Sequence, residues 1–392
     1  SLEIGGRYTP NIKATEIMLY DGLSAVSSSN PHSIDFRAMI KPLHRFMPAG
    51  FYYKTFIKQK VWSIVEDRLR SLSGFSKAPS VTDEDVYDHI FQHTEVLVIG
   101  GGVAGMSAAL EVLSGSKVAR VILVDERENL GGELTNEFIT DQTATLWFQE
   151  AKGKLQKYRD EDNSRLKILK SATAYAWYDH NYIEVLQTHG TGQSMVHESG
   201  QTARKVLHKI RTKEVILATG AHERPMLFET NDLANIMLSQ SVRRYINEFN
   251  VVAGKEIVLY GNNDSIYNTA IDLSKHNIKS KVVDVRASGN ESEIILEAKK
   301  IGIEVFQGFA VLKAKGKSRV TGVEISQVEM QAKPPHWKSK WRITGDTKTI
   351  NCDLLATSGG FNPVVHLDCH CGGKTYFDET SQSFLPQKER KE

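Results

Sequence analysis

Two segments of the chain repeat the same order of hydrophobic and polar positions. In residues 94–125, the apolar run "EVLVI" enters a glycine turn, small and apolar residues follow at helical spacing, and a second apolar run, "VILVD", comes after them. Residues 255–286 repeat this plan, from "EIVLY" through a turn and a helical stretch to "SKVVDVR". Short apolar runs alternating with helical segments are typical of parallel strand–helix–strand units. We therefore expect an α/β protein with two dinucleotide-binding, Rossmann-like domains.

Two further apolar runs end in related turns, "KEVILATGAHERP" (213–225) and "NCDLLATSGGFNP" (351–363). We expect both strands to belong to the first sheet, on either side of an inserted second domain. The predicted boundaries are 94–229 and 340–392 for the first domain and 230–339 for the inserted one. This layout is that of the two-domain flavoprotein reductases.

Residues 1–93 lack this alternation and are predicted to form a loop-rich extension. Within it, "KQKVWSIVEDRLRSLSG" (58–74) places apolar residues at helical spacing before Gly74, which predicts one amphipathic helix. The aromatic run at 51–56 contains Phe51, Tyr52, Tyr53 and Phe56, side-chain types that anchor protein interfaces. We expect a partner protein to cover this run.

Composition excludes several classes of function. The 49 basic and 47 acidic side chains leave a net charge of +2, so we expect no nucleic-acid partner. No apolar stretch is long enough for a membrane helix, and we expect a cytoplasmic protein. The three cysteines, Cys352, Cys369 and Cys371, are too few and wrongly spaced for a disulfide framework, an iron–sulfur cluster or a structural zinc site. We expect no metal.

The first glycine turn has the spacing of a phosphate-binding loop. Gly100, Gly102 and Gly105 fit G-x-G-x-x-G between a strand and a helix, and Asp125 lies twenty residues after Gly105. The first glycine permits the tight turn, the second lets a pyrophosphate approach, and the third allows close helix–strand packing. Val103 and Ala104 open the helix, whose N-terminal N–H groups attract phosphate.

Asp125 is expected to accept hydrogen bonds from the ribose hydroxyls of an adenosine, with Glu126 as the fallback. Because its charge repels a 2′-phosphate, the residues predict FAD or NAD rather than NADP. The following "LGGEL" (130–134) supports the same site, with Gly131 and Gly132 as further contacts.

The second glycine turn keeps only its first glycine. Asn263 and Ile266 stand where Gly261-x-G-x-x-G would have small residues. A side chain at 263 blocks the pyrophosphate, and Ile266 pushes the helix from the strand. We predict that the inserted domain holds no nucleotide; the alternative is an atypical loop that uses asparagine side chains as donors.

Several stretches resemble one family, the alpha subunit of heterotetrameric sarcosine oxidase. They are "KATEIMLYDGL" (13–23), "PAGFYYKTF" (48–56), "VLVIGGGVAGMSAAL" (96–110), "LATGAHERPMLF" (217–228), "YGNNDSIYNTAIDL" (260–273) and "LLATSGGFNPVVHL" (354–367). The resemblance implies a subunit with NAD in its first domain, with FAD as the alternative. It also implies a beta subunit that carries the flavins for the oxidative demethylation of sarcosine to glycine, FMN at the border between the two, and further small subunits.

The resemblance also carries over the nucleotide-contacting residues: Gly100, Gly102, Gly105, Asp125, Glu126, Gly131, Gly132, Thr219, Gly220, Gly359 and Phe361. Family members are longer, with a ferredoxin-like stretch before this region and a folate-binding domain after it. We therefore expect the nucleotide-binding portion of such a subunit, without folate chemistry.

Two alternatives remain open. One is an FAD-binding subunit of a related amine or amino-acid dehydrogenase complex, of the proline dehydrogenase or cyanide-forming glycine oxidase type. The other is a non-catalytic scaffold whose nucleotide is structural. No catalytic residue is assigned, because His222, Glu223 and Arg224 are interpreted as a polar strand end beside the nucleotide, and Tyr52, Tyr53 and Lys54 as core or interface.

Overall fold

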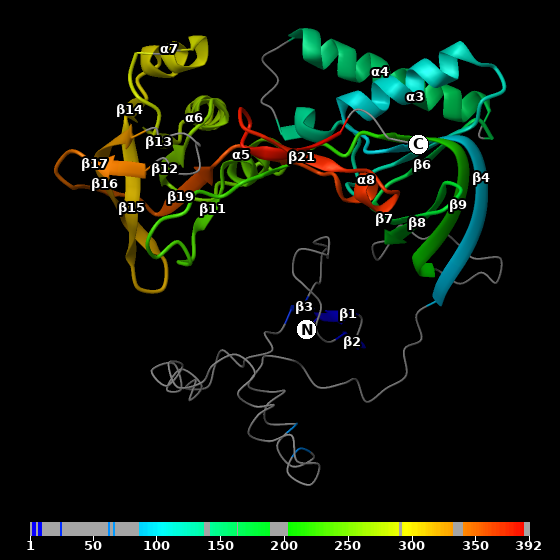
Figure 1. Ribbon diagram of the computed structural model, residues 1–392, viewed down its shortest axis with the longest axis horizontal. Coiled ribbons are helices and arrows are strands. Elements are labelled where there is room, and N and C mark those ends of the chain that lie inside the picture. Colours follow the sequence, from blue (N-terminus) through cyan, green and yellow to red (C-terminus); the bar gives the residue numbers. More distant parts are fainter. Residues whose placement is uncertain are drawn as a thin grey trace. The chain divides into compact units, whose positions relative to one another are not determined.

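The computed structural model describes residues 86–136, 142–162, 164–188, 203–289, 292–331 and 340–387, together with 2–4, 7–9, 24–25, 62 and 66 (Figure 1). The chain divides into two compact units: one comprises Ser1–Asp88 and Thr188–Val206, and the other His89–Gln187 and Leu207–Glu392. In the first, strand β1 (Leu2–Ile4) pairs antiparallel with β2 (Arg7–Thr9) and β3 (Ser24–Ala25). The aromatic run at 51–56 and most of the predicted helix 58–74 lie outside the described residues.

A six-stranded sheet in the order β6-β5-β4-β9-β8-β7 lies mostly in the larger unit. Its strands are β4 (Val86–Ile99), β5 (Val121–Val124), β6 (Leu166–Leu169), β7 (Ala172–Tyr178), β8 (Tyr182–Thr188) and β9 (Ala203–Leu217). The central pairings β4–β5 and β5–β6 are parallel. β4 begins at Val86, before the boundary predicted at residue 94.

Both faces of this sheet are covered, which explains the continuous apolar run of β5. Val98 and Leu123 point to one face, where they pack against helices α3 (Val103–Gly115) and α4 (Gln142–Glu161) (Figure 1). Leu97 and Ile122 point to the other face and pack with residues of β7 and β8. Because successive side chains of a strand alternate between faces, one short run serves both cores.

A second, wholly parallel sheet has the order β11-β19-β12-β13-β14. Its strands are β11 (Ile236–Leu238), β12 (Glu256–Gly261), β13 (Lys279–Asp284), β14 (Glu304–Gln307) and β19 (Leu354–Ser358). Helices α5 (Ser239–Asn247), α6 (Ser265–Lys275) and α7 (Glu293–Lys300) pack on one face. The other face is covered by β15 (Phe309–Gly316), β16 (Val320–Gln331) and β18 (Lys348–Asn351); β17 (Lys340–Ile343) pairs with β16.

The second sheet is inserted into the first domain, as predicted. The chain leaves through β10 (Ala221–Glu223) and returns through β20 (Phe361–Pro363), and these two strands pair antiparallel. After β20, helix α8 (His366–His370) places Leu367 in the core of the first sheet. The hairpin of β21 (Thr375–Asp378) and β22 (Ser383–Pro386) follows.

One strand assignment was wrong. We expected the strand within residues 351–363 to return to the first sheet, but residues 354–358 form β19, which lies between β11 and β12 in the second sheet. The predicted boundary at 340 therefore falls too early, since the crossover comes after Ser358. An apolar run before a glycine turn fits any buried parallel strand, and its neighbours are fixed only by tertiary pairing.

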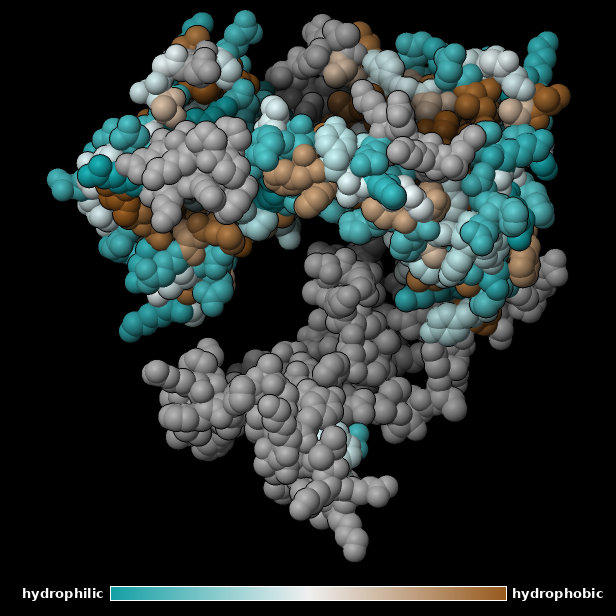
Figure 2. Space-filling view, viewed as in Figure 1, coloured by the Kyte–Doolittle hydropathy of each residue, from teal (hydrophilic) through white to brown (hydrophobic). Residues whose placement is uncertain are grey.

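Among the described residues, no helix combines the length and apolar character needed to cross a membrane. Hydrophobic side chains gather on the surface over α3 and α4, where Leu146 is largely exposed (Figure 2).

Candidate nucleotide-binding site

Two glycines of the first loop are required by the fold itself. Gly100 has φ +108, and a Cβ there would lie 2.1 Å from the Ala218 carbonyl oxygen. A Cβ on Gly105 would lie 1.7 Å from the Gly100 carbonyl oxygen. These glycines let β9 approach the loop and let α3 pack against it. Their presence is thus explained without any ligand.

Gly102 is different, because the protein does not require a glycine there. It is the N-cap of α3, with the ordinary extended angles φ −75 and ψ −170. A Cβ at this position would meet only the Cα of Gly132, at an ordinary contact distance of 3.7 Å. The space beside Gly102 therefore forms a cradle that a side chain would fill. It lies at the N-terminus of a 13-residue helix, where Val103, Ala104 and Gly105 present first-turn N–H groups.

Asp125 closes one side of this cradle at the end of β5. Its carboxylate is buried and accepts hydrogen bonds from the backbone N–H of Gly101 (2.5 Å, to Oδ2) and of Arg127 (2.7 Å, to Oδ1). Each carboxylate oxygen can accept a second hydrogen bond. Asp125 can thus hold the loop and still accept from ribose hydroxyls. Glu126, the predicted fallback, is exposed.

The turn at Gly131 and Gly132 forms the opposite wall. Both glycines have positive φ, and the Gly131 N–H donates to the Gly101 carbonyl oxygen at 2.8 Å. Arg127 fixes this turn, since its Nη1 donates to the Gly132 carbonyl oxygen at 2.9 Å and its Nη2 pairs with Glu133 Oε1 at 3.1 Å. Sequence reasoning did not identify this role of Arg127. A short 3-10 helix, η3 (Gly132–Asn136), continues from the turn.

The structure brings Thr219 and Gly220 beside the first loop. They follow Ala218, whose N–H donates to the Ile99 carbonyl oxygen at 2.7 Å. Gly359 and Phe361 lie instead on the crossover: the Gly359 N–H donates to the Arg224 carbonyl oxygen at 2.6 Å, and Phe361 pairs with Glu223. The predicted residues from Gly100 to Gly132 therefore form one cluster, and Gly359 follows a strand of the second sheet.

Glu223, interpreted from the sequence as part of a polar strand end, is a half-buried carboxyl group at this crossover. Its Oε2 accepts a hydrogen bond from the backbone N–H of Gln240 (2.8 Å), in the first turn of α5. Burial raises the pKa of Glu223 to about 7, and the nearby negative charge of Glu133 acts in the same direction. The sequence feature that could have drawn attention to this carboxyl group is an acidic residue three positions after the "ATG" turn.

In the second loop, the protein's own side chains fill the corresponding space. Asn263 Nδ2 donates to the Ser358 carbonyl oxygen (3.2 Å) and hydroxyl (3.0 Å), and its Oδ1 accepts from the Ser265 N–H (3.1 Å). Ile266 is fully buried, and its Cγ2 lies 2.8 Å from the position a Cβ on Gly261 would take. The loop is therefore closed by contacts within the protein.

The acidic residue that follows the second loop also makes hydrogen bonds within the protein. Asp284, at the end of β13, has no exposed surface and accepts hydrogen bonds from Tyr267 Oη (2.8 Å) and Arg286 Nη2 (2.8 Å). Arg286 also pairs with Asp264 in the loop through Nη1 at 2.8 Å. Its contacts with these two carboxylates raise the pKa of Arg286 although burial opposes the charge. Arg286 thus links the loop, through Asp264, to the acidic residue at the end of β13, Asp284.

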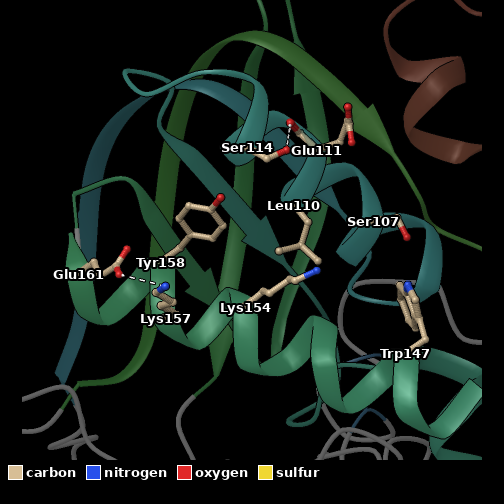
Figure 3. Close-up of a pocket in the computed structure, with 9 residues that line it drawn as sticks. All are labelled: Ser107, Leu110, Glu111, Ser114, Trp147, Lys154, Lys157, Tyr158 and Glu161. Carbon is tan, nitrogen blue, oxygen red and sulfur yellow. Dashed lines mark hydrogen bonds and ion pairs between the residues drawn. The ribbon is translucent and has the colours of Figure 1, made fainter.

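A groove of about 520 Å³ lies between α3 and α4 (Figure 3). Leu110, Trp147 and Tyr158 contribute its ring and aliphatic surfaces, and Lys154 and Lys157 lie along α4. Lys154 pairs with Glu150 and Lys157 with Glu161, so the charges are locally balanced. The groove contains none of the predicted nucleotide contacts.

Within the part of the chain that the structure describes, no group of three histidine, cysteine or acidic side chains could hold a metal ion. Cys352 is buried, which raises the pKa of its thiol to about 12; Cys369 is exposed. A thiol with such a raised pKa is unreactive near neutral pH.

Comparisons with known proteins show the family of this chain. Residues 94–384 match the family described as pyridine nucleotide-disulphide oxidoreductase. Sarcosine oxidase subunit alpha of Rhizobium meliloti (strain 1021) is 32% identical over 97% of this chain and 36% of the relative. The same subunit of Corynebacterium sp. (strain U-96) is 33% identical over 94% of this chain and 38% of the relative. The resemblance expected from the sequence is confirmed, and this chain spans about a third of these relatives' length.

A solved structure, the L-proline dehydrogenase from P. horikoshii, matches 80% of this chain and 51% of its own, with a TM-score of 0.52 and 20% identity. At this identity the likeness establishes the fold alone, that of the two-domain flavoprotein reductases.

Proposed function

Because this chain belongs to the pyridine nucleotide-disulphide oxidoreductase family, we propose that it is the NAD-binding portion of the alpha subunit of a sarcosine oxidase. Its relatives by sequence carry the name of that subunit over nearly all of this chain. In this proposal, a beta subunit carries the flavins that oxidise sarcosine to glycine, and FMN lies at the border with it.

The observation that carries the proposal is the contrast between the two glycine loops. The first has a cradle at Gly102 that the protein leaves unfilled and an acid, Asp125, placed for an unphosphorylated ribose. The second is filled by Asn263 and Ile266. A single dinucleotide site suits a subunit that supports oxidation by a partner, because hydride relay within one chain needs two cofactors.

The residues of the first site fit a dinucleotide, and each has a definite task. The first turn of α3 stabilises the pyrophosphate charge, Asp125 fixes the ribose, and Arg127 holds the turn at Gly132 against the loop. NAD, when bound, supplies a nicotinamide ring able to accept or release hydride. Buried Asp125 also orients the first loop through Gly101, so the cradle is formed before the ligand arrives.

Oxygen consumption with sarcosine tests the function directly. We expect no sustained consumption by the purified chain alone and restored consumption when a flavin-bearing beta subunit and the small subunits are added. The reason is that, in this proposal, the flavins that accept electrons from sarcosine lie in the beta subunit. Sustained oxidation of sarcosine without a partner would contradict the proposal, as would a complete complex that oxidises proline but not sarcosine.

A further inference from the structure

A row of aromatic and basic side chains crosses the outer face of four neighbouring strands, β4, β9, β8 and β7 (Figure 1). Ile210 on β9 and Ile183 on β8 are fully buried in the core on the inner face. Because side chains alternate along a strand, Lys209 and Arg211 on β9 and Tyr182 on β8 point to the outer face. The core described above therefore uses one face of these strands and leaves the other for a different contact.

Ring and cation contacts join the outer side chains from strand to strand. The ammonium of Lys209 lies over the ring of Phe91 on β4, with Nζ 5.1 Å from the ring centroid. The guanidinium of Arg211 lies over the ring of Tyr182, with Cζ 5.5 Å from the centroid. The ring of Tyr182 in turn contacts that of Tyr178 on β7, and their centroids are 5.6 Å apart. We call these five residues the ring–cation strip.

The rings of the strip expose much of their apolar surface. Phe91 is 72% exposed and Tyr178 is 52% exposed, and Tyr175, beside the strip on β7, is 45% exposed. A single exposed ring is ordinary on a protein surface, whereas several joined on one face of a sheet are typical of an interaction site. The exposed rings thus indicate a surface that a binding partner can cover.

The two cations of the strip keep their charge available for such a partner. Among the described residues, neither Lys209 nor Arg211 forms an ion pair, and a ring attracts a cation without neutralising it. Glu184, on the same face of β8, accepts hydrogen bonds from three hydroxyl groups, those of Tyr175 (2.9 Å), Tyr178 (3.4 Å) and Tyr182 (3.3 Å). The planar guanidinium of Arg211 can therefore still donate two N–H groups to a carboxylate from outside.

We propose that the ring–cation strip is a docking surface for a partner subunit that presents carboxylates to Lys209 and Arg211 and an apolar side chain to the exposed rings. This inference rests on the proposed function of the chain as one subunit of an oxidase. Charge complementarity selects this occupant, because the two cations have no acidic partner within the described residues. Aromatic and arginine side chains are also the types that contribute most to binding between proteins.

A single-stranded nucleic acid is the rival occupant, because bases stack on rings and phosphates bind cations. Glu184 disfavours it, since a backbone with a negative charge on every nucleotide would pass close to this carboxylate. A protein surface can instead place carboxylates opposite Lys209 and Arg211 alone. The net charge of +2 for the whole chain adds no general attraction for nucleic acid.

The test measures binding of the whole chain to an immobilised complex of the flavin-bearing beta subunit and the small subunits by interferometry. We expect Arg211→Ala to raise Kd about tenfold or more and Arg211→Glu about a hundredfold, because the reversed charge faces a carboxylate. Phe91→Ala should raise Kd about tenfold through the lost apolar contact. Arg244→Ala is the matched control and should leave Kd unchanged: Arg244 also lies over a ring, that of Phe249 at 5.3 Å, but it pairs with Glu248 at 2.6 Å.

The salt dependence of binding supplies a second readout, which a loss of folding would not reproduce. Raising NaCl from about 0.1 M to about 1 M shortens the Debye length from about 10 Å to about 3 Å. The wild-type affinity should therefore fall, and the fall should be smaller for Arg211→Ala. Phe91→Ala should keep the wild-type salt dependence, because it removes an apolar contact. Urea unfolding checks that each variant is folded.

The outcomes separate the inference from the proposed function. If the wild-type chain does not bind the other subunits, the proposed function is wrong and the inference falls with it. If the wild-type chain binds and the variants at Arg211 and Phe91 bind equally well, the inference alone is wrong. Binding of a labelled single-stranded oligonucleotide that Arg211→Ala abolishes would contradict it. Dimerisation of the chain alone that Arg211→Glu abolishes would also contradict it, because the occupant would then be a second copy.

Discussion

At the scale of single residues, the three glycines of the first loop have separable roles. Gly100 and Gly105 are needed by the protein, because a Cβ at either would clash with a backbone oxygen. A Cβ at Gly102 would cause no such clash, since its nearest neighbour would be the Cα of Gly132 at 3.7 Å. The sequence motif places all three in one pattern, and only the structure distinguishes a glycine kept for the fold from one kept for a ligand.

We therefore predict that Gly102→Ala folds with nearly unchanged stability but loses most of its NAD affinity, because the methyl group enters the pyrophosphate's space. Gly100→Ala should lower the free energy of unfolding by about 2 kcal/mol or more, since it combines a positive φ with a backbone clash. Gly115→Ala is the control, at the last residue of α3, where a Cβ meets nothing within 4 Å. Urea unfolding and NAD titration measure both effects. Strong destabilisation by Gly102→Ala with intact NAD affinity would refute this division of roles.

The sequence predicts a residue's role best when the residues it contacts are close to it along the chain. Gly100, Gly102, Gly105 and Asp125 could be grouped as one predicted site because a single strand–helix–strand unit positions them all. Glu223 could not be assigned a role from the sequence, because its carboxyl group contacts Gln240 and Ser358, which are distant from it along the chain. A polar residue's function is hidden when its partners are set by tertiary packing.

At the scale of elements, the strand–helix–strand plan was predictable for both sheets, because their buried strands are continuous apolar runs. The strands that pair with β19 were not predictable, since its sequence "LLATS" has the same pattern as the strand ends of the first sheet. Its register against Ile236–Leu238 on one side and Ile257–Gly261 on the other decides its place. Pairing between distant strands is information that periodicity does not contain.

The second loop leads to a prediction about Arg286, which links the loop to fully buried Asp284. Arg286→Ala should lower the free energy of unfolding by about 3 kcal/mol, because it leaves a buried carboxylate with only part of its compensation. The control is Lys281→Ala on the same sheet, which removes an exposed pair with Glu304 and should cost less than about 1 kcal/mol. Chemical unfolding measures both. Equal, small effects would mean that Arg286 is a surface charge without a structural task.

At the scale of the whole molecule, two sheets with a similar strand–helix–strand plan have different glycine loops. At Gly102 of the first, a Cβ would meet no clash, whereas side chains of the second, Asn263, Ile266 and Arg286, make contacts within their own loop. The fold resembles reductases of two domains, whereas the relatives by sequence are oxidase subunits about three times as long. Our account is that this chain contributes one dinucleotide to a larger assembly.

Mass spectrometry of the nucleotide released from natively purified, denatured protein tests this central claim most directly. The account predicts NAD, at one molecule per chain: of the two glycine loops, the first is the one proposed to bind a pyrophosphate, and Asp125 is placed to select a free ribose. A yellow protein that releases FAD, or two nucleotides per chain, would contradict it.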